Sequence, residues 1–233
     1  MKITWLGQAG LLFEREGLTL MVDPYLSDSV AKVNPANYRR VPVDERFFDI
    51  TPDVLLITHD HLDHYDPETA PRFFAKTDKR ITVLAPTTAW NKARAHGGVH
   101  YYVEMTRHCE WTANGMRITA VKAAHSDPYA LGYVLEDLVE DRTYYITGDT
   151  LYNSEIFADL PKHLDVVFCP INGVGNNMNA ADAARFCRNT GAKIAVPLHF
   201  GMFDELDPAS LFLFENRVIP VLYREIDLKG EKQ

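Results

Sequence analysis

Residues 58–64 carry the side chains with the clearest chemistry in this sequence. They read T-H-D-H-L-D-H and place three histidines and two aspartates in six positions after the apolar run 54–57. Imidazole and carboxylate groups are ligands that zinc, manganese and iron accept in proteins. A buried core has no use for so many polar side chains in a row, since each would need a hydrogen-bond partner. The segment therefore predicts a divalent metal site, with an ordinary solvated loop as the alternative.

Three further metal-competent residues follow apolar stretches. His125 comes after residues 118–124, Asp149 after 144–148 and His199 after 194–198. The ends of strands are where α/β folds build their sites, because a rigid sheet holds the bases of the loops. Taken alone, each histidine is compatible with a hydrogen-bonded core residue and the aspartate with a turn. Together with the dense cluster, they predict one shared metal site.

The predicted secondary structure that must position these residues changes its pattern along the chain. Residues 2–6, 11–14 and 18–22 have the pattern of antiparallel strands, and residues 34–49 look like a long surface loop. From residue 54, apolar strands alternate with helices. We expect strands at 54–58, 81–84, 116–123, 131–136, 143–147, 165–171, 193–198 and 219–223. We expect helices from 66, at 87–95, at 154–157, from the cap Asn179 to Gly191, and at 208–214.

Length and composition favour one domain of the α/β class over residues 1–233. The chain is 46% hydrophobic and 24% charged, as in ordinary globular proteins, and no Gly-, Ser- or Pro-rich linker divides it. A formal net charge of −8 disfavours nucleic acid and anionic membranes as partners. The three cysteines are odd in number and suit reduced packing residues. The N-terminal stretch does not have the pattern of a signal peptide, so we expect a cytoplasmic protein.

The ordered set of histidines and aspartates resembles the metallo-β-lactamase superfamily. The family signature H-x-H-x-D-H stands here at residues 59–64, and the later His, Asp and His positions at 125, 149 and 199. Asp23 matches an early aspartate of the family. The resemblance extends from residue 1 to about residue 207 and implies a four-layer αββα sandwich of two mixed sheets flanked by helices.

The resemblance also implies roles for individual residues. One metal would be held by His59, His61 and His125. A second would be held by Asp63, His64 and His199. Asp149 would bridge the two ions, and Asp23 would orient the histidine-rich loop, as residues behind metal ligands often do. Zn²⁺ is the expected metal, and Mn²⁺ or Fe²⁺ also suits such ligands.

Two divalent ions imply a hydrolytic mechanism without a side-chain nucleophile. A water bridging two metals loses a proton near neutral pH and attacks a carbonyl carbon or phosphorus. In this scheme Asp63 exchanges the proton and Asp149 holds the metals together. The sequence contains no G-x-S-x-G element, which agrees with such a mechanism.

Within the superfamily, the chain looks most like the branch of L-ascorbate-6-phosphate lactonase. The shared pieces are W-L-G-Q-A-G at residues 5–10, D-P-Y at 23–25, T-G-D-T at 147–150 and P-L-H-F at 197–200. The lactonase lacks the histidine that stands here as His125. The expected activity is hydrolysis of a small ester or lactone. The alternatives are a phosphodiesterase acting on a small or lipid phosphodiester, and a metal-binding regulatory protein.

Residues next to the predicted ligands are candidates for the substrate pocket. They are Tyr25, Asp127, Thr150 and Phe200, together with Asn172 and Asn176 of the loop 172–177. Each has an alternative role as a packing or connecting residue. Arg39, Arg40 and Arg46 either clamp a phosphate or form a solvated charge cluster, and we favour the latter. The expected partner is a small molecule, and the sequence gives no indication of oligomeric state.

Overall fold

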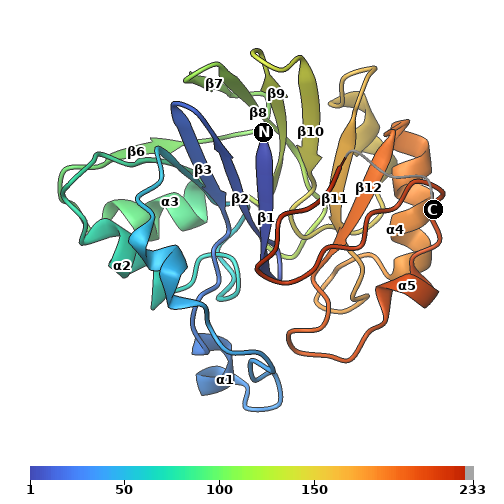
Figure 1. The fold of residues 1–233 in the computed structure, drawn as a ribbon, viewed down its shortest axis with the longest axis horizontal. Helices are drawn as coiled ribbons and strands as arrows, with labels where there is room; N and C mark the ends of the chain where they lie inside the picture. Colours follow the sequence, from blue (N-terminus) through green and yellow to red (C-terminus); the bar gives the residue numbers. More distant parts are fainter. Residues whose placement is uncertain (229–233) are drawn as a thin grey trace.

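Two six-stranded sheets face each other in the computed structural model, which describes residues 1–228 (Figure 1). In both sheets the spatial order of the strands is their order along the chain. The first sheet contains β1 (Lys2–Gly7), β2 (Gly10–Arg15), β3 (Leu18–Val22), β4 (Val54–Leu56), β5 (Thr82–Ala85) and β6 (Tyr101–Glu104). The second contains β7 (Glu110–Ala113), β8 (Met116–Lys122), β9 (Leu131–Asp137), β10 (Arg142–Ile146), β11 (Val166–Pro170) and β12 (Ile194–Leu198).

Helices cover the outer face of each sheet. Figure 1 shows α2 and α3 outside the first sheet and α4 and α5 outside the second. The helical elements are α1 (Ser29–Val33), η1 (Glu45–Asp49), α2 (Thr69–Phe74), α3 (Thr87–Arg94), η2 (Ser154–Ala158), α4 (Ala180–Thr190) and α5 (Pro208–Leu211), where η1 and η2 are 3₁₀-helices. The predicted αββα sandwich is confirmed. Among the described residues, no helix has both the length and the apolar character to cross a membrane.

Both sheets are mixed, and this directs many strand ends to one edge. Strands β1 to β3 are antiparallel neighbours, whereas β3 to β6 run parallel. Strands β7 to β10 are antiparallel neighbours, and β10 to β12 run parallel. Consequently β1, β3 and β4 point the same way in the first sheet, and β8, β10, β11 and β12 do so in the second. The loops that follow these strands are therefore able to meet.

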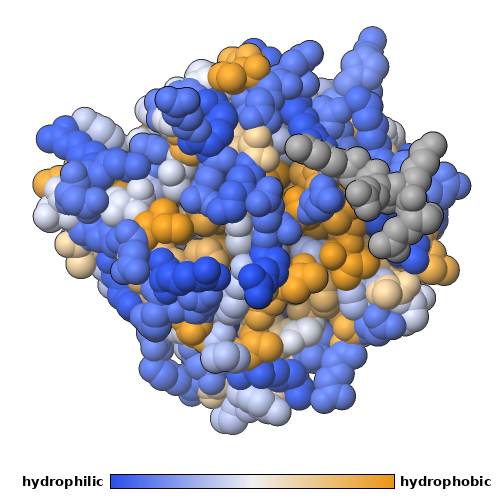
Figure 2. All heavy atoms as spheres, in the orientation of Figure 1, coloured by the Kyte–Doolittle hydropathy of each residue, from blue (hydrophilic) through white to orange (hydrophobic). Residues whose placement is uncertain are grey.

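Alternation of side chains along the strands divides the core into two layers. Leu11 and Phe13 of β2 point between the sheets, while Leu12 packs outward under the first sheet's helices. The same alternation appears in β4, where Leu55 faces outward against Phe73 of α2. Period-two alternation places successive residues on opposite faces. The face drawn in Figure 2 is mainly hydrophilic, with hydrophobic atoms exposed in smaller patches.

The strand expected at 219–223 is absent from the described residues. Instead the segment makes one bridge from Arg217 to Ala195 near β12 and another from Glu225 to Thr4 in β1. It thus crosses between an edge strand of each sheet. Its neighbouring residues pair with each sheet only at these isolated positions, so no strand forms.

Other elements also differ from expectation. Strands β6 and β7 and helix α1 were not predicted, and the supposed surface loop 34–49 ends in η1, which buries Phe47 and Phe48. Helix α2 begins at Thr69 and not at residue 66, since Asp66 accepts hydrogen bonds from Glu68 N and Thr69 Oγ1 in the turn before it. The stretch 154–157 is 3₁₀, and α5 ends at Leu211 because Phe212 turns into the core.

Candidate metal centre

The predicted metal ligands meet at the edge where strands of both sheets end. His59 follows β4 in the first sheet, and the other three strand-end residues follow β8, β10 and β12 in the second. Each lies within three residues of its strand, so the sheets fix its backbone. The shared edge therefore brings together side chains 140 positions apart in the sequence, from residue 59 to residue 199.

Seven side chains form three overlapping groups that can hold a metal ion. Within each group, one ligand atom per residue lies within 4.8 Å of the others. The groups are His59, His61 and His125; Asp63, His64 and His199; and His59, His64 and Asp149. The first two match the two sets expected from the sequence, and the third places Asp149 between them. Geometry thus brings together every residue predicted to bind metal.

Unsatisfied buried atoms at the centre show that these residues fit a cation. The Nε2 atoms of His59 and His64 and the Oδ1 atom of Asp149 are buried and make no hydrogen bond. These residues are also one of the three ligand groups. A buried polar atom without a partner is costly, and a divalent cation satisfies such atoms.

Asp149 lies close to residues of both expected metal sets. Its Oδ1 is 3.3 Å from His64 Nε2, and its Oδ2 is 3.4 Å from His199 Nε2. Asp63 Oδ2 lies 3.1 Å from the same His199 nitrogen. On the other side, His125 Nε2 is 3.1 Å from the Nδ1 atom of His61. The carboxylate of Asp149 therefore occupies a central position.

Buried negative charge shifts the pKa values of the centre. Burial lowers the pKa of His64, but the carboxylates of Asp149, Asp23 and Asp63 outweigh it, so the net pKa is well above 6.5. Burial also lowers the pKa of His199, but the carboxylates of Asp149 and Asp63 outweigh it and raise this pKa to about 10. Burial and the neighbouring His64 hold the pKa of His59 well below 6.5. The carboxylates thus create a strong demand for positive charge, which metal ions also meet.

Asp23 holds the histidine-rich loop in place. It is fully buried and accepts hydrogen bonds from the backbone N–H and the hydroxyl of Thr58. Its Oδ2 is also 2.8 Å from His64 Nδ1. When Nδ1 of His64 carries a proton, it donates to Asp23, and Nε2 of His64 faces Asp149. Residues behind a metal ligand commonly fix the tautomer of a histidine in this way.

Two amides at the centre were missed by the sequence analysis. Gln8 Nε2 donates to Asp63 Oδ2 at 3.0 Å, and its backbone oxygen accepts from His199 N at 3.1 Å. Asn177 Nδ2 donates to Asp149 Oδ2 at 2.7 Å. Gln8 follows β1 at the same edge as the ligands, a position that signals a site residue. Asn177 belongs to the loop 172–177, which the sequence analysis placed near the pocket, although its contact with Asp149 was not predicted.

Gly148 permits the close approach of the two sheets at the centre. Its φ is +59°, and a Cβ here would lie 2.9 Å from both Leu131 O and Thr58 Cβ. Real Cβ atoms do not tolerate such contacts, and L-residues are disfavoured at this φ. Glycine is therefore required for Asp149 to reach the loop that begins at Thr58.

Several predicted pocket residues have other roles. Tyr25 and Thr150 are fully buried, which agrees with their alternative role as packing residues. Tyr25 OH accepts from Val30 N, and Thr150 Oγ1 accepts from Ala124 N. Phe200 is also buried, with its ring 4.8 Å from that of Trp5. These side chains point into the core, and their position next to site residues in the sequence did not show this.

The arginines of the 34–49 segment are engaged with their own surroundings. Arg39 donates to the backbone oxygens of Tyr25 and Val41. Arg40 pairs with Glu205 at 3.3 Å and Arg46 with Asp44 at 2.8 Å. These contacts favour structural and surface roles over a phosphate clamp.

Two open pockets border the centre, one at His61 and Asp63 and the other at His125. One, of about 410 Å³, is lined by His61, Asp63, Leu62, Lys92, Asp60 and part of α1 with Asn34. The other, of about 390 Å³, is lined by His125 and by residues that include the predicted pocket residues Asp127 and Asn176. Asn172 lies farther back, half-buried, with its backbone bridged to Asn179. The half-buried ligands His61 and Asp63 are open to the first pocket, and half-buried His125 is open to the second.

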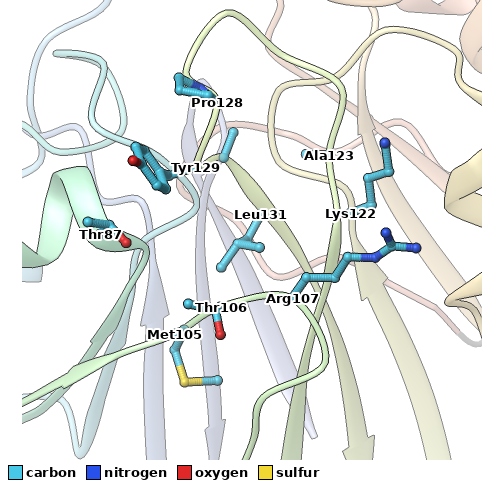
Figure 3. A pocket seen from close by; sticks show the side chains of 10 residues that line it. Thr87, Met105, Thr106, Arg107, Lys122, Ala123, Pro128, Tyr129 and Leu131 are labelled. Carbon is cyan, nitrogen blue, oxygen red and sulfur yellow. The ribbon is translucent and has the colours of Figure 1, made fainter.

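A third pocket, of about 240 Å³, extends the His125 side away from the metals. It shares Lys122, Ala123 and Pro128 with the pocket beside His125. Figure 3 shows the side chain of Leu131 near its middle, with Tyr129 on one side and Lys122 on the other. The two pockets therefore form one continuous groove.

Comparison with known proteins identifies the class to which this fold and site belong. A family model described as "Beta-lactamase superfamily domain" matches residues 2–199. The sequence is 29% identical over 210 residues to a UPF0173 protein of Pyrococcus furiosus, covering 89% of this chain and 87% of that one. It is 28% identical to a UPF0173 metal-dependent hydrolase of Solibacter usitatus over 224 residues, covering 88% and 87%.

The solved structure of isothiocyanate hydrolase from Delia radicum gut bacteria has a similar fold. Its TM-score is 0.73 at 19% identity, with 97% of this chain and 98% of that chain covered. Together, fold, family match and relatives define a metal-dependent hydrolase of the metallo-β-lactamase fold. The chain belongs to the β-lactamase superfamily. The names of the UPF0173 relatives specify no substrate, so the ascorbate-phosphate branch stays a prediction.

Proposed function

We propose that this protein hydrolyses a small ester or lactone with two divalent cations. His59, His61 and His125 hold one cation, and Asp63, His64 and His199 hold the other, with Asp149 between them. The observation that carries the proposal is the set of buried, unsatisfied His and Asp atoms at the meeting point of the ligand groups. Zn²⁺ is the proposed metal, and Mn²⁺ and Fe²⁺ suit the same ligands.

The bound cations supply Lewis acidity and lower the pKa of water to near 7. The protein's own residues provide proton transfer and position. Of the two acidic residues of the centre, Asp63 is half-buried and open to the pocket on the His61 side, whereas Asp149 is 5% exposed. Asp63 is therefore the residue placed to accept a proton from the entering water and to release it later in the step. The Gln8 amide holds its Oδ2 in place.

The pockets and charge support a small organic substrate. The pockets beside the metals have volumes of about 390 and 410 Å³, within the range of small-molecule sites. The net charge of −8 opposes binding of a nucleic acid. We further propose a cytoplasmic location, which the three free cysteines support.

Assay of metal-loaded protein against lactones, esters and bis(p-nitrophenyl) phosphate tests this proposal. We expect ester or lactone turnover that is lost after chelation and restored by Zn²⁺ or Mn²⁺. Asp63→Asn should lower kcat at least about 100-fold, the contribution typical of a general acid–base residue, and Asn189→Asp serves as a remote control. Turnover of the phosphodiester alone, or turnover of none of the compounds by protein with confirmed metal, would contradict the proposal.

A further inference from the structure

We propose that an apolar shelf beside the metal centre binds the acyl chain of the substrate, so that esters of aliphatic carboxylic acids are preferred. This acyl shelf consists of Val30 and Val33 of α1 together with Leu62. The inference rests on the proposed ester hydrolysis and names the part of the substrate that gives specificity. It assigns α1, which carries no metal ligand, a direct role in recognition.

The acyl shelf is continuous with the candidate metal site. Val30, Val33 and Leu62 line the same pocket as His61 and Asp63. A carboxyl carbon at the metals therefore has its chain directed along this wall. Figure 1 shows α1 beyond the ends of the strands, at the bottom of the view, where it borders the loops that follow them.

Helix α1 is fixed so that its valines face the pocket. Val30 and Val33 are three residues apart and so lie on one helical face. Lys32 lies off that face and pairs with Glu68 at 2.6 Å. The preceding Asp28 accepts from Arg39 N at 2.8 Å, which ties the start of α1 to the next segment. The shelf is thus a held surface and not a free loop.

The acyl shelf exposes apolar area that a ligand can bury. Val33 is 76% exposed, although it sits at the mouth of the pocket next to predicted metal ligands. Covering such a side chain with a hydrocarbon chain is favourable in proportion to the apolar area removed from water. An aliphatic chain therefore gains affinity at this position.

Charge at the shelf favours a neutral chain over a phosphate. Lys92 lines the pocket, but its Nζ is 2.7 Å from Asp60 Oδ2 and 3.2 Å from the Asp60 backbone oxygen. The ammonium group is therefore neutralised by its neighbour. A charged ligand group would have to break this pair, whereas a methylene chain would leave it intact.

The pocket on the other side of the metals suits the alcohol part. It is lined by polar groups from Asp127, Asn153 and Asn176 as well as Lys122. The contrast between the two pockets gives the substrate its direction, with the acyl chain toward α1 and the leaving alcohol toward His125.

Binding of straight-chain carboxylates, the acyl products, tests the shelf independently of turnover. Calorimetric titration of metal-loaded protein with acetate, butyrate, hexanoate and octanoate should show about two- to threefold tighter binding per added CH₂. The kcat/KM values for the matching p-nitrophenyl esters should rise in parallel. Val33→Asn should flatten both series with little change for acetate, and Val33→Leu should steepen them.

Val139→Asn is the matched control, since Val139 is 66% exposed and lies in the turn after β9. It should behave as wild type. Equal affinity of wild type for acetate and octanoate, or unchanged chain-length dependence in both Val33 variants, would overturn the shelf. Chain-length-dependent binding without turnover of any ester would support the shelf and contradict the proposed function, so the two failures are distinguishable.

Discussion

Three residues beside the metal centre have a strained backbone conformation. Gln8, Asp23 and His199 have φ values of +47°, +41° and +61°. Non-glycine residues in this region cost on the order of 1 kcal/mol each and persist where surrounding contacts hold them. Each directly follows a strand, and the turn lets its side chain point toward the shared site. Strain here is the consequence of directing strand-end residues to one point.

The amide of Gln8 should influence metal affinity although it is not a ligand. Gln8→Leu removes the donor to Asp63 and leaves that carboxylate free to rotate. We expect about a 10-fold loss of affinity for one metal ion, the effect of losing a residue that orients a ligand. Competition with a chromogenic chelator measures this loss. Asn189→Leu, an exposed amide outside the site, is the control, and equal affinity of the two variants would contradict the role of Gln8.

At the residue scale, the sequence predicted what depends on residue type and local spacing. The H-x-H-x-D-H cluster and the polar residues after apolar strands consist of residue types that bind metals, so the sequence alone indicates their chemistry. The amides of Gln8 and Asn177 do not, because an amide suits many environments. The burial of Tyr25 and Thr150 could not be read from the sequence, because side-chain direction in an irregular segment depends on the tertiary structure.

The elements next to the metals must approach one another closely, and Gly148 is where this can be tested. Gly148→Ala forces a Cβ against Leu131 O and Thr58 Cβ at 2.9 Å. Gly191→Ala, the control, has a similar φ of +72° but meets nothing within 4 Å.

We expect the control to lose about 1 kcal/mol of unfolding free energy from its φ alone. Gly148→Ala should lose about 2–4 kcal/mol, because overpacking adds to that cost. Urea unfolding of both variants measures the difference. Equal losses would show that the sheets tolerate a side chain here.

A carboxylate ties η2 to the second sheet and should make stability depend on pH. Asp159 accepts hydrogen bonds from Arg107 Nε at 2.7 Å, His108 Nε2 at 3.0 Å and Lys122 N at 2.9 Å. Burial raises its pKa, but these donors outweigh burial and hold it below 3.8. Because the folded pKa lies below the unfolded value, the contribution is complete above about pH 4 and is lost as pH falls further.

Asp159→Asn should therefore lower the free energy of unfolding at pH 7 by about 2 kcal/mol. The gap between wild type and variant should narrow below about pH 4. Denaturant unfolding at several pH values checks this, with Glu45→Gln at an exposed ion pair to Arg72 as a control expected to change little. If the difference in unfolding free energy between wild type and Asp159→Asn were constant with pH, the stabilising role of the Asp159 carboxylate would be refuted.

At the element scale, prediction depended on how strongly apolar residues mark a segment. Strands with continuous apolar runs, such as β3 and β11, were found close to their observed bounds. Strands β6 and β7 have four residues each and are only partly buried, so they lack the continuous apolar run that marks the other strands. The stretch 219–223 is apolar because it packs across the strand edges, and the isolated nature of the backbone pairing around it is a property of the whole fold.

The whole molecule matters because neither sheet alone contains the metal centre. His59, His61, Asp63 and His64 come from the loop after β4 of the first sheet, and the remaining ligands follow strands of the second. Metal content therefore reports on the packing of the two sheets as well as on the ligands. The resemblance to a known family made this long-range arrangement predictable, since local sequence patterns do not show which strand ends meet.

The central claim is that two metal ions share Asp149, and metal stoichiometry tests it most directly. Elemental analysis of metal-reconstituted wild type and Asp149→Ala, after removal of free metal, gives the number of ions per chain. We predict about two in wild type and at most about one in the variant, because Asp149 lies between both ligand sets. One ion or fewer per chain in wild type, or two retained by Asp149→Ala, would contradict the claim.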